Sequence, residues 1–229
     1  MEDYTSRNLT IASDKFVALS GLAKKSSESL QSEYLAGLWS KCIHVGLAWE
    51  VHTEAHAVRV PARASSWSWA AVDGPVQWKS MDSGGSIASD DGLLVSAIML
   101  VEATLEKTTP DPFGPVKNAG LTITGRLRSV PGRFMLMNSI LTYPQWLSGR
   151  TEKIGYFIED EERAIEGDLL CLMVAKKPFG IGPSLPPTNI ILVLEDAEQG
   201  ISTYRRVGCG QIFPPDFFDE TAMTTLRLV

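Results

Sequence analysis

The sequence predicts a mainly β, α+β protein, in which a helical N-terminal segment packs on an antiparallel β-barrel or sandwich. In the first quarter of the 229 residues, apolar side chains recur at helical spacing. From Val58 onward, β-branched and aromatic residues cluster in short runs separated by Gly, Pro and Asp. We therefore expect a helical segment over residues 1–57 and a barrel or sandwich over residues 58–229, joined in one compact unit.

The helical segment is expected to contain two helices after an extended start at residues 1–12. Ser13 and Asp14 are good N-caps, and apolar residues at helical spacing follow them until about residue 30. A second apolar stripe predicts a helix over Ser32–Lys41.

The remainder of the chain reads as a series of strands with hardly any helical pattern between them, which favours antiparallel pairing. The nine expected strands are Ser66–Val72, Gly92–Leu105, Gly120–Arg128, Arg133–Leu136, Gly155–Ile158, Leu169–Ala175, Asn189–Glu195, Tyr204–Ile212 and Thr224–Val229. Long loops over residues 79–91, 108–118 and 177–188 are where binding residues are expected. The charged segment Glu159–Arg163 reads as a solvated turn.

Composition excludes several classes of protein. The net charge of −6, with no basic stripe, argues against a nucleic-acid partner, and no apolar run reaches the roughly 20 residues of a membrane helix. The polar start at Met1–Tyr4 has no hydrophobic signal region, so we expect an intracellular, cytoplasmic protein. The three cysteines are widely spaced, which suits buried thiols rather than disulfides or a metal knuckle.

Two tryptophans form the most distinctive stretch. Trp67 and Trp69 alternate with serines, so in a strand both indoles would share one face before the turn at Asp73–Pro75. That face either belongs to the core or stacks on a substrate. For the second alternative, the candidate substrate-binding residues are Trp67, Trp69 and the loop aromatics Tyr143 and Trp146.

The candidate catalytic residues are three histidines and one aspartate. His44, His52 and His56 lie in one short window, and imidazoles titrate near neutrality, as general acids and bases require. His52 and His56 have the spacing of two zinc ligands, but no third ligand is evident, so no metal site is expected. Asp73 either caps the turn or supplies a catalytic carboxylate.

Several stretches resemble the region that follows the HET domain in fungal heterokaryon-incompatibility proteins. They are Tyr4–Thr10, Ser13–Ala23, Glu33–Trp39 and Ser66–Ala70 with Asp73–Gly74. Their order and spacing are similar to the family patterns YSxRxLTxxxDKLxALSGLA, YLAGLW and APSWSWASxDG. The resemblance is strong over residues 4–78 and continues more weakly to the C-terminus. One departure is Ser65, which stands where the family has proline.

The resemblance implies a fungal origin but assigns no catalytic residues. The motifs of the HET domain itself are missing, so cell-death activity is not implied. Neither a nucleophile motif nor a phosphate-binding loop is present, so no cofactor is expected. We expect a cofactor-independent cyclase, isomerase or lyase (dehydratase) of fungal secondary metabolism that encloses a small apolar metabolite. The alternative is a non-catalytic regulatory or ligand- or protein-binding module, and homo-oligomerisation stays open.

Overall fold

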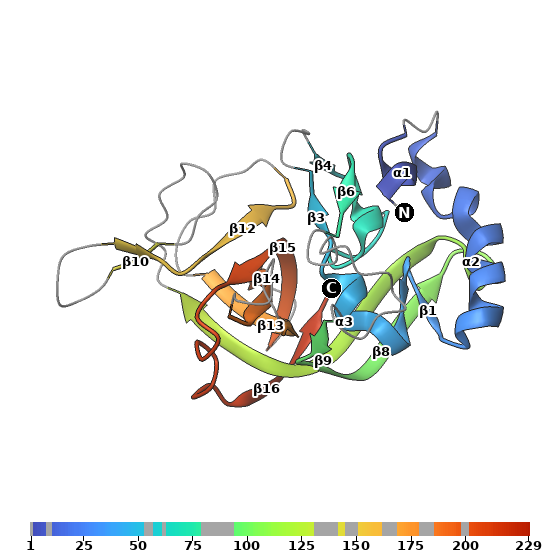
Figure 1. Cartoon of the computed structure of the whole chain (residues 1–229). Coiled ribbons are helices and arrows are strands. Elements are labelled where there is room, and N and C mark those ends of the chain that lie inside the picture. The colour runs from blue at the N-terminus through green and yellow to red at the C-terminus, as the bar shows by residue number, and fades with distance from the viewer. Residues whose placement is uncertain are drawn as a thin grey trace.

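A computed structural model gives the fold of the chain. It describes residues 2–7, 11–52, 57–60, 63–78, 94–130, 142–144, 151–161, 169–178, 186–197 and 202–229, with the backbone alone at 12–13, 142–144 and 151–153. Strands dominate this part of the chain, and an eight-stranded sheet is its largest element. The mainly β, α+β class is therefore confirmed (Figure 1).

The N-terminal part combines short helices with two-residue strands. The elements are α1 (Glu2–Thr5), η1 (Ala12–Lys15), α2 (Val17–Leu30), β1 (Tyr34–Leu35), β2 (Leu38–Trp39), η2 (Ser40–Cys42), α3 (Ile43–Leu47), β3 (Glu50–Val51), β4 (Val58–Arg59), η3 (Trp69–Ala71), β5 (Val72–Asp73) and β6 (Val76–Gln77). Helix α2 matches the helix expected to end near residue 30. It stops at Gln31, whose left-handed backbone lets its N–H donate to the carbonyl of Ser27. Where an extended start was predicted, α1 forms instead.

The helix predicted over residues 32–41 is wrong, because β1 and β2 form a tight hairpin there. The turn consists of Ala36 and Gly37, both with positive φ angles of 43° and 98°. Such a turn interrupts any helix, and the carbonyl of Gly37 accepts a hydrogen bond from Nε1 of Trp69 at 3.0 Å. The apolar stripe of this segment therefore faces the core from a hairpin.

The strand predicted over Ser66–Val72 is also wrong over most of its length. Ser68 caps a short 3₁₀ helix by accepting a hydrogen bond from the N–H of Ala70, and extended pairing begins only at β5. Strand β5 pairs with β4, and β6 pairs with β3. The β3–β6 ladder therefore joins residues on either side of position 57.

The strands of the second part are β7 (Val95–Ser96), β8 (Met99–Lys107), β9 (Val116–Val130), β10 (Thr142–Pro144), β11 (Thr151–Lys153), β12 (Gly155–Glu159), β13 (Leu169–Lys177), β14 (Thr188–Asp196), β15 (Thr203–Ile212) and β16 (Met223–Leu228). Most of them lie close to their predicted positions, but β7 and β8 divide the single strand predicted at Gly92–Leu105, and the short strands β10 and β11 match no predicted strand. The predicted strand at Arg133–Leu136 and the loop at 79–91 lie outside the described residues.

Five of these strands, β9, β13, β14, β15 and β16, form a closed ring. Strand β9 pairs with β13 through its second half and with β16 through its middle. The remaining pairs, β13–β14, β14–β15 and β15–β16, complete a barrel-like ring, in which β15–β16 is parallel and the other pairs are antiparallel. Strand β8 extends the ring along the first half of β9, and Figure 1 shows β9 curving from the ring toward α2.

Both faces of the central strands are buried. On β13, Leu172 and Val174 belong to one hydrophobic cluster, whereas Cys171 and Met173 belong to another on the opposite face. The first cluster also contains Phe16, Leu47, Trp49, Trp67 and Trp69 of the N-terminal part. The N-terminal part and the barrel therefore share one core.

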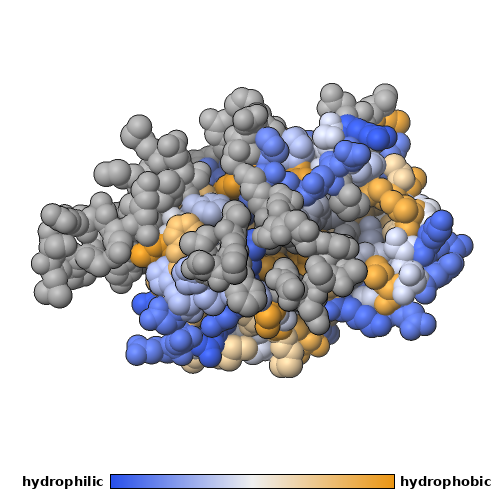
Figure 2. All heavy atoms as spheres, viewed as in Figure 1, coloured by the Kyte–Doolittle hydropathy of each residue, from blue (hydrophilic) through white to orange (hydrophobic). Residues whose placement is uncertain are grey.

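The outer surface is mixed in character. Figure 2 shows hydrophilic side chains along the edge where α2 lies, beside smaller hydrophobic patches. Exposed apolar side chains include Leu22 and Leu30 of α2 and Met99 and Val101 of β8. Among the described residues, no helix is long and apolar enough to cross a membrane.

Glycine at position 37 should be required for stability. A Cβ added there would lie 2.6 Å from Nε1 of Trp69, and φ is positive. Gly37→Ala is expected to lower the free energy of unfolding by at least about 2 kcal/mol. The matched control is Gly21→Ala in α2, where a Cβ meets nothing within 4 Å, and it should stabilise by up to about 1 kcal/mol. Urea unfolding measures both, and an equal effect at the two positions would refute the packing argument.

Candidate functional site

A buried guanidinium joins the N-terminal part to the barrel. Arg206 of β15 has no exposed surface, and its Nε and Nη2 donate to the two carboxylate oxygens of Asp160, each at 2.9 Å. Nη1 and Nη2 also donate to the carbonyls of Leu47 and Trp49, respectively, and Cζ lies 3.4 Å from the centroid of the Trp49 ring. A charge so far from water is tolerated only when a carboxylate and other acceptors replace its hydration, as they do here.

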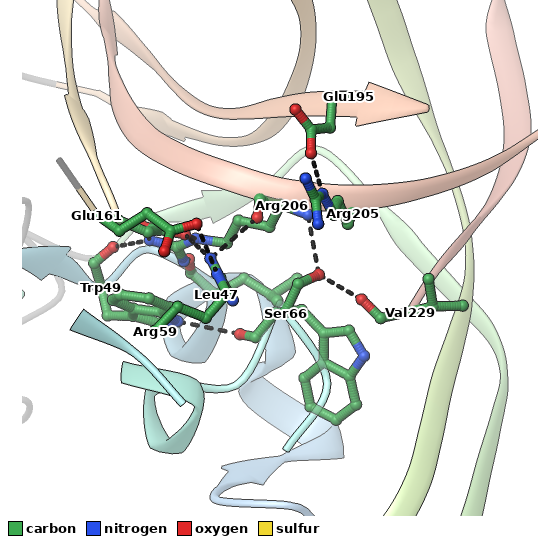
Figure 3. A network of polar contacts seen from close by, with 11 residues as sticks. Leu47, Trp49, Arg59, Ser66, Glu161, Glu195, Arg205, Arg206 and Val229 are labelled. Carbon is green, nitrogen blue, oxygen red and sulfur yellow. Dashed lines mark hydrogen bonds and ion pairs between the residues drawn. The ribbon is translucent and has the colours of Figure 1, made fainter. Parts of the chain in front are cut away.

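Two further residues extend this network to the protein surface (Figure 3). Arg59 of β4 donates to Asp160 and to the carbonyl of Arg206, and it pairs with Glu161 at 3.4 Å. The hydroxyl of Ser66 accepts from the N–H of Arg206 at 2.9 Å and donates to the carbonyl of Val229. Arg59 therefore connects β4 to β15, and Ser66 connects the Ser–Trp stretch to β15 and to the residue that follows β16.

Sequence reasoning missed both members of the central ion pair. The segment Glu159–Arg163 was expected to be a solvated turn, but Asp160 is fully buried. Regular alternation of side chains along β15 would place Arg206 and Cys209 on opposite faces of the sheet. A bulge at Val207 breaks this alternation, because Gly208 and Arg206 pair with successive residues of β14 and Val207 pairs with none of them. The adjacent pair Arg205–Arg206 was the available signal, because consecutive strand residues face opposite sides.

An open groove of about 1260 Å³ lies over this network. Its walls come from Arg59 and residues 64–66 of the N-terminal part, from β8 and the start of β9, and from the ends of β14 and β16. Arg59, Ser66 and Val229 belong both to the groove and to the network (Figure 3). The floor of the groove is therefore held by buried hydrogen bonds.

The groove carries charges of both signs. Its charged lining residues are Arg59, Lys117, Arg205, Arg227, Glu106, Glu195 and Asp196. Lys117 pairs with Glu106 at 3.0 Å, and Arg205 pairs with Glu195. The carboxyl of Glu106 has a lowered pKa because it accepts hydrogen bonds from Lys117 and Asn118. The walls are therefore mostly made of neutralised pairs.

A second, smaller groove of about 630 Å³ lies between the end of α2, β1 and β8. Tyr34 lines it and packs against Trp39 and Phe113, with ring centroids 5.1 and 5.5 Å apart. Burial raises the pKa of Tyr34 far above its ordinary value, so its phenol stays protonated. This groove offers aromatic surface and a neutral hydroxyl.

Trp67 and Trp69, predicted to bind substrate, lie in the core with no exposed surface, and neither lines the two grooves. The ring of Trp69 packs edge-on against Tyr4, with centroids 6.1 Å apart, and at a tilt against Phe16, with centroids 6.4 Å apart. The carbonyl of Trp67 accepts a hydrogen bond from Nε1 of Trp49 at 3.0 Å. Of the two alternatives that the sequence left open, core packing and substrate stacking, both side chains follow the first.

The predicted histidines lie in different environments. His44 of α3 is half-buried, and its Nε2 is 3.1 Å from the carbonyl of Leu94, to which only an N–H can donate. Burial lowers the pKa of His44, although this hydrogen bond opposes the shift. His52 is half-buried, and its backbone N–H donates to Pro75. His56 and Trp146 lie outside the described residues, and Tyr143 is described by its backbone alone.

Asp73 belongs to a small charged cluster. Its carboxylate is half-exposed and lies 2.6 Å from Nη1 of Arg63 and 3.8 Å from Nζ of Lys15. Lys15 is buried, donates to the carbonyl of Val72 and lies 5.4 Å from the ring centroid of Trp69. Among the predicted site residues, Asp73 and Trp69 are therefore brought together, because both contact Lys15.

The described residues contain no group of three or more His, Cys, Asp or Glu side chains arranged to hold a metal ion. Comparison with protein-family models, with curated proteins and with solved structures gives no match for the chain. The functional argument therefore depends on the geometry of the grooves and on their charges.

Removing the carboxylate partner of Arg206 should be severely destabilising. Asp160→Asn leaves a buried cation without its counter-charge, and we expect a loss of about 3–5 kcal/mol in the free energy of unfolding. The matched control is Glu195→Gln, which removes the partner of the neighbouring Arg205 at the half-exposed surface and should cost at most about 1 kcal/mol. Chemical denaturation gives both values. The double variant Asp160→Leu with Arg206→Met should recover much of the loss, and its failure to do so would show that the network acts by more than charge.

Lys15 should make stability rise with pH in the alkaline range. Burial and the neighbouring Arg63 lower the pKa of Lys15 from its ordinary value of 10.5 to about 8, although Asp73 opposes them. Between these two values the unfolded chain holds a proton that the folded chain has released, so raising the pH favours folding. Relative to Lys15→Met, the wild type should gain about 3 kcal/mol between pH 7 and pH 10.5. A difference between the two proteins that stays constant with pH, measured by urea unfolding, would contradict this.

Proposed function

We propose that the chain is a non-catalytic protein-binding module, which holds an extended peptide segment of a partner in the groove over the Arg206 network. The groove itself carries the proposal, because its volume of about 1260 Å³ exceeds the roughly 300–1,000 Å³ of small-molecule sites and its walls are charged. A peptide supplies backbone donors and acceptors along its whole length, which suits walls of both signs.

Other classes of ligand suit these walls less well. An apolar metabolite would cover the charged pairs without replacing their hydrogen bonds to water, and burying unsatisfied polar groups costs free energy. A nucleic acid would bring phosphates against Glu106, Glu195 and Asp196 on a chain whose net charge is −6. These two points favour a polypeptide occupant.

The cofactor-independent enzyme expected from the sequence stays a prediction. Such chemistry needs an enclosed site with acid and base groups beside the substrate. The described candidate catalytic and substrate-binding residues make structural contacts instead. The two tryptophans lie in the core, His44 is hydrogen-bonded to Leu94, and Asp73 is paired with Arg63. A binding role also agrees with the resemblance to a region that accompanies an effector domain.

Filling the groove should abolish peptide binding. Ala197 lines the groove at the end of β14, and Ala197→Trp would place an indole in it. Peptides selected from a random dodecapeptide library on the wild-type protein should bind Ala197→Trp at least about tenfold more weakly, as measured by fluorescence anisotropy.

The matched control is Ala18→Trp on the exposed face of α2, away from both grooves, and it should bind these peptides like the wild type. Failure of the library to yield any binder, or equal binding by the two tryptophan variants, would show that the groove is not a peptide site.

A further inference from the structure

The cationic side chains that line the groove differ in whether they are paired with a carboxylate. Arg59 pairs with Asp160 and Glu161. Lys117 pairs with Glu106, and Arg205 pairs with Glu195. In the part of the chain that the structure describes, Arg227 has no carboxylate partner. Its Nη2 donates to the hydroxyl of Thr104 at 2.7 Å, and this neutral contact leaves its charge uncompensated.

The backbone of β9 gives Arg227 a fixed position. Gly120 lies beneath the guanidinium, and a Cβ at this glycine would come within 2.6 Å of Cζ of Arg227. The planar group therefore rests on bare backbone, held at one end by Thr104 of β8. A guanidinium has five N–H donors, so most of those of Arg227 stay available in the groove. Positioning in advance reduces the entropy that binding must cost.

We propose that Arg227 anchors an anionic side chain of the bound peptide, either the carboxylate of Asp or Glu or the phosphate of a phosphorylated residue. This inference rests on the proposed peptide-binding function and names the chemistry of the partner. A guanidinium matches the two oxygens of such a group with two parallel hydrogen bonds. The paired carboxylates of Glu106 and Glu195 flank the groove, so one acidic residue is accepted at the position of Arg227 and a run of acidic residues is repelled.

The test is a parallel selection of the dodecapeptide library on the wild type, on Arg227→Gln and on the control Arg7→Gln, which removes an exposed arginine outside both grooves. Wild type and Arg7→Gln are expected to enrich peptides with one acidic residue at a fixed position, and Arg227→Gln is expected to lose this preference. Circular dichroism and thermal unfolding establish that each variant is folded.

Synthetic versions of one selected peptide then identify the anion. They carry glutamate, phosphoserine, glutamine or serine at that position, and inorganic phosphate serves as a competitor. Arg227→Gln should weaken the better of the two anionic peptides by roughly 10-fold to 100-fold and leave the two neutral peptides unchanged. Tighter binding of the glutamate or of the phosphoserine peptide assigns the carboxylate or the phosphate. Thr104→Val keeps the charge but removes the hydroxyl that holds it, and should give a smaller loss.

The outcomes separate the two proposals. Peptides that Ala197→Trp excludes but that bind wild type and Arg227→Gln equally would leave the groove as a peptide site and overturn the role of Arg227. Neutral peptides that bind as tightly as the anionic ones would overturn it as well. Peptides that Ala197→Trp does not exclude would overturn the groove itself. If added salt weakens the anionic peptides more than the neutral ones, the charge-based contact is supported.

Discussion

The arrangement of this protein depends on one buried charge. Arg206 lies where the barrel meets the N-terminal part, and each nitrogen of its guanidinium donates to an acceptor from Asp160, Leu47 or Trp49. A buried ion pair contributes little net stability, because desolvation offsets its attraction. The ion pair instead selects one arrangement of the two parts. If the N-terminal part were rotated or shifted, the guanidinium would lose the carbonyls of Leu47 and Trp49, so other arrangements are strongly disfavoured. The hydrophobic core supplies the driving force for docking, and the network restricts its geometry.

This restriction extends to the surface. Arg59 and Ser66 contact the network from the side that lines the groove, so the groove has a floor of fixed hydrogen bonds and walls of paired charges. Rigid walls reduce the conformational entropy lost on binding, and unpaired charges in such walls act as specific contacts. Arg227 differs from the other cations of the walls, since Arg59, Lys117 and Arg205 are each paired with a carboxylate.

Local patterns in the sequence predicted local structure well and contacts between distant segments poorly. Helix α2 and strands β13, β14 and β15 follow from continuous runs whose period or β-branched content is clear. The hairpin at Ala36–Gly37 was missed because an apolar stripe fits a helix as well as a short hairpin. Alternation at Trp67 and Trp69 suggested a strand, whereas the cap at Ser68 bends the chain. The groove and the ion pair Asp160–Arg206 bring together segments from the whole chain, and a register bulge, which no single-sequence pattern reveals, decides which way Arg206 points.

Closure of the strand ring affects how the chain reaches this fold. Strand β9 needs β13 and β16 as neighbours, and both follow it at long distance in the sequence, while β16 meets β15 through only the register Thr203–Arg227 and Tyr204–Leu228. Contacts between distant segments form slowly because long loops must close first. During synthesis on the ribosome, β9 can pair at once with β8, which precedes it, but it leaves the exit tunnel well before β13 and β16, so the backbone that these two strands will cover stays unpaired. Until β16 arrives, the nascent chain presents an edge that can pair with other chains, so chaperone binding and the rate of translation should influence the yield of folded protein.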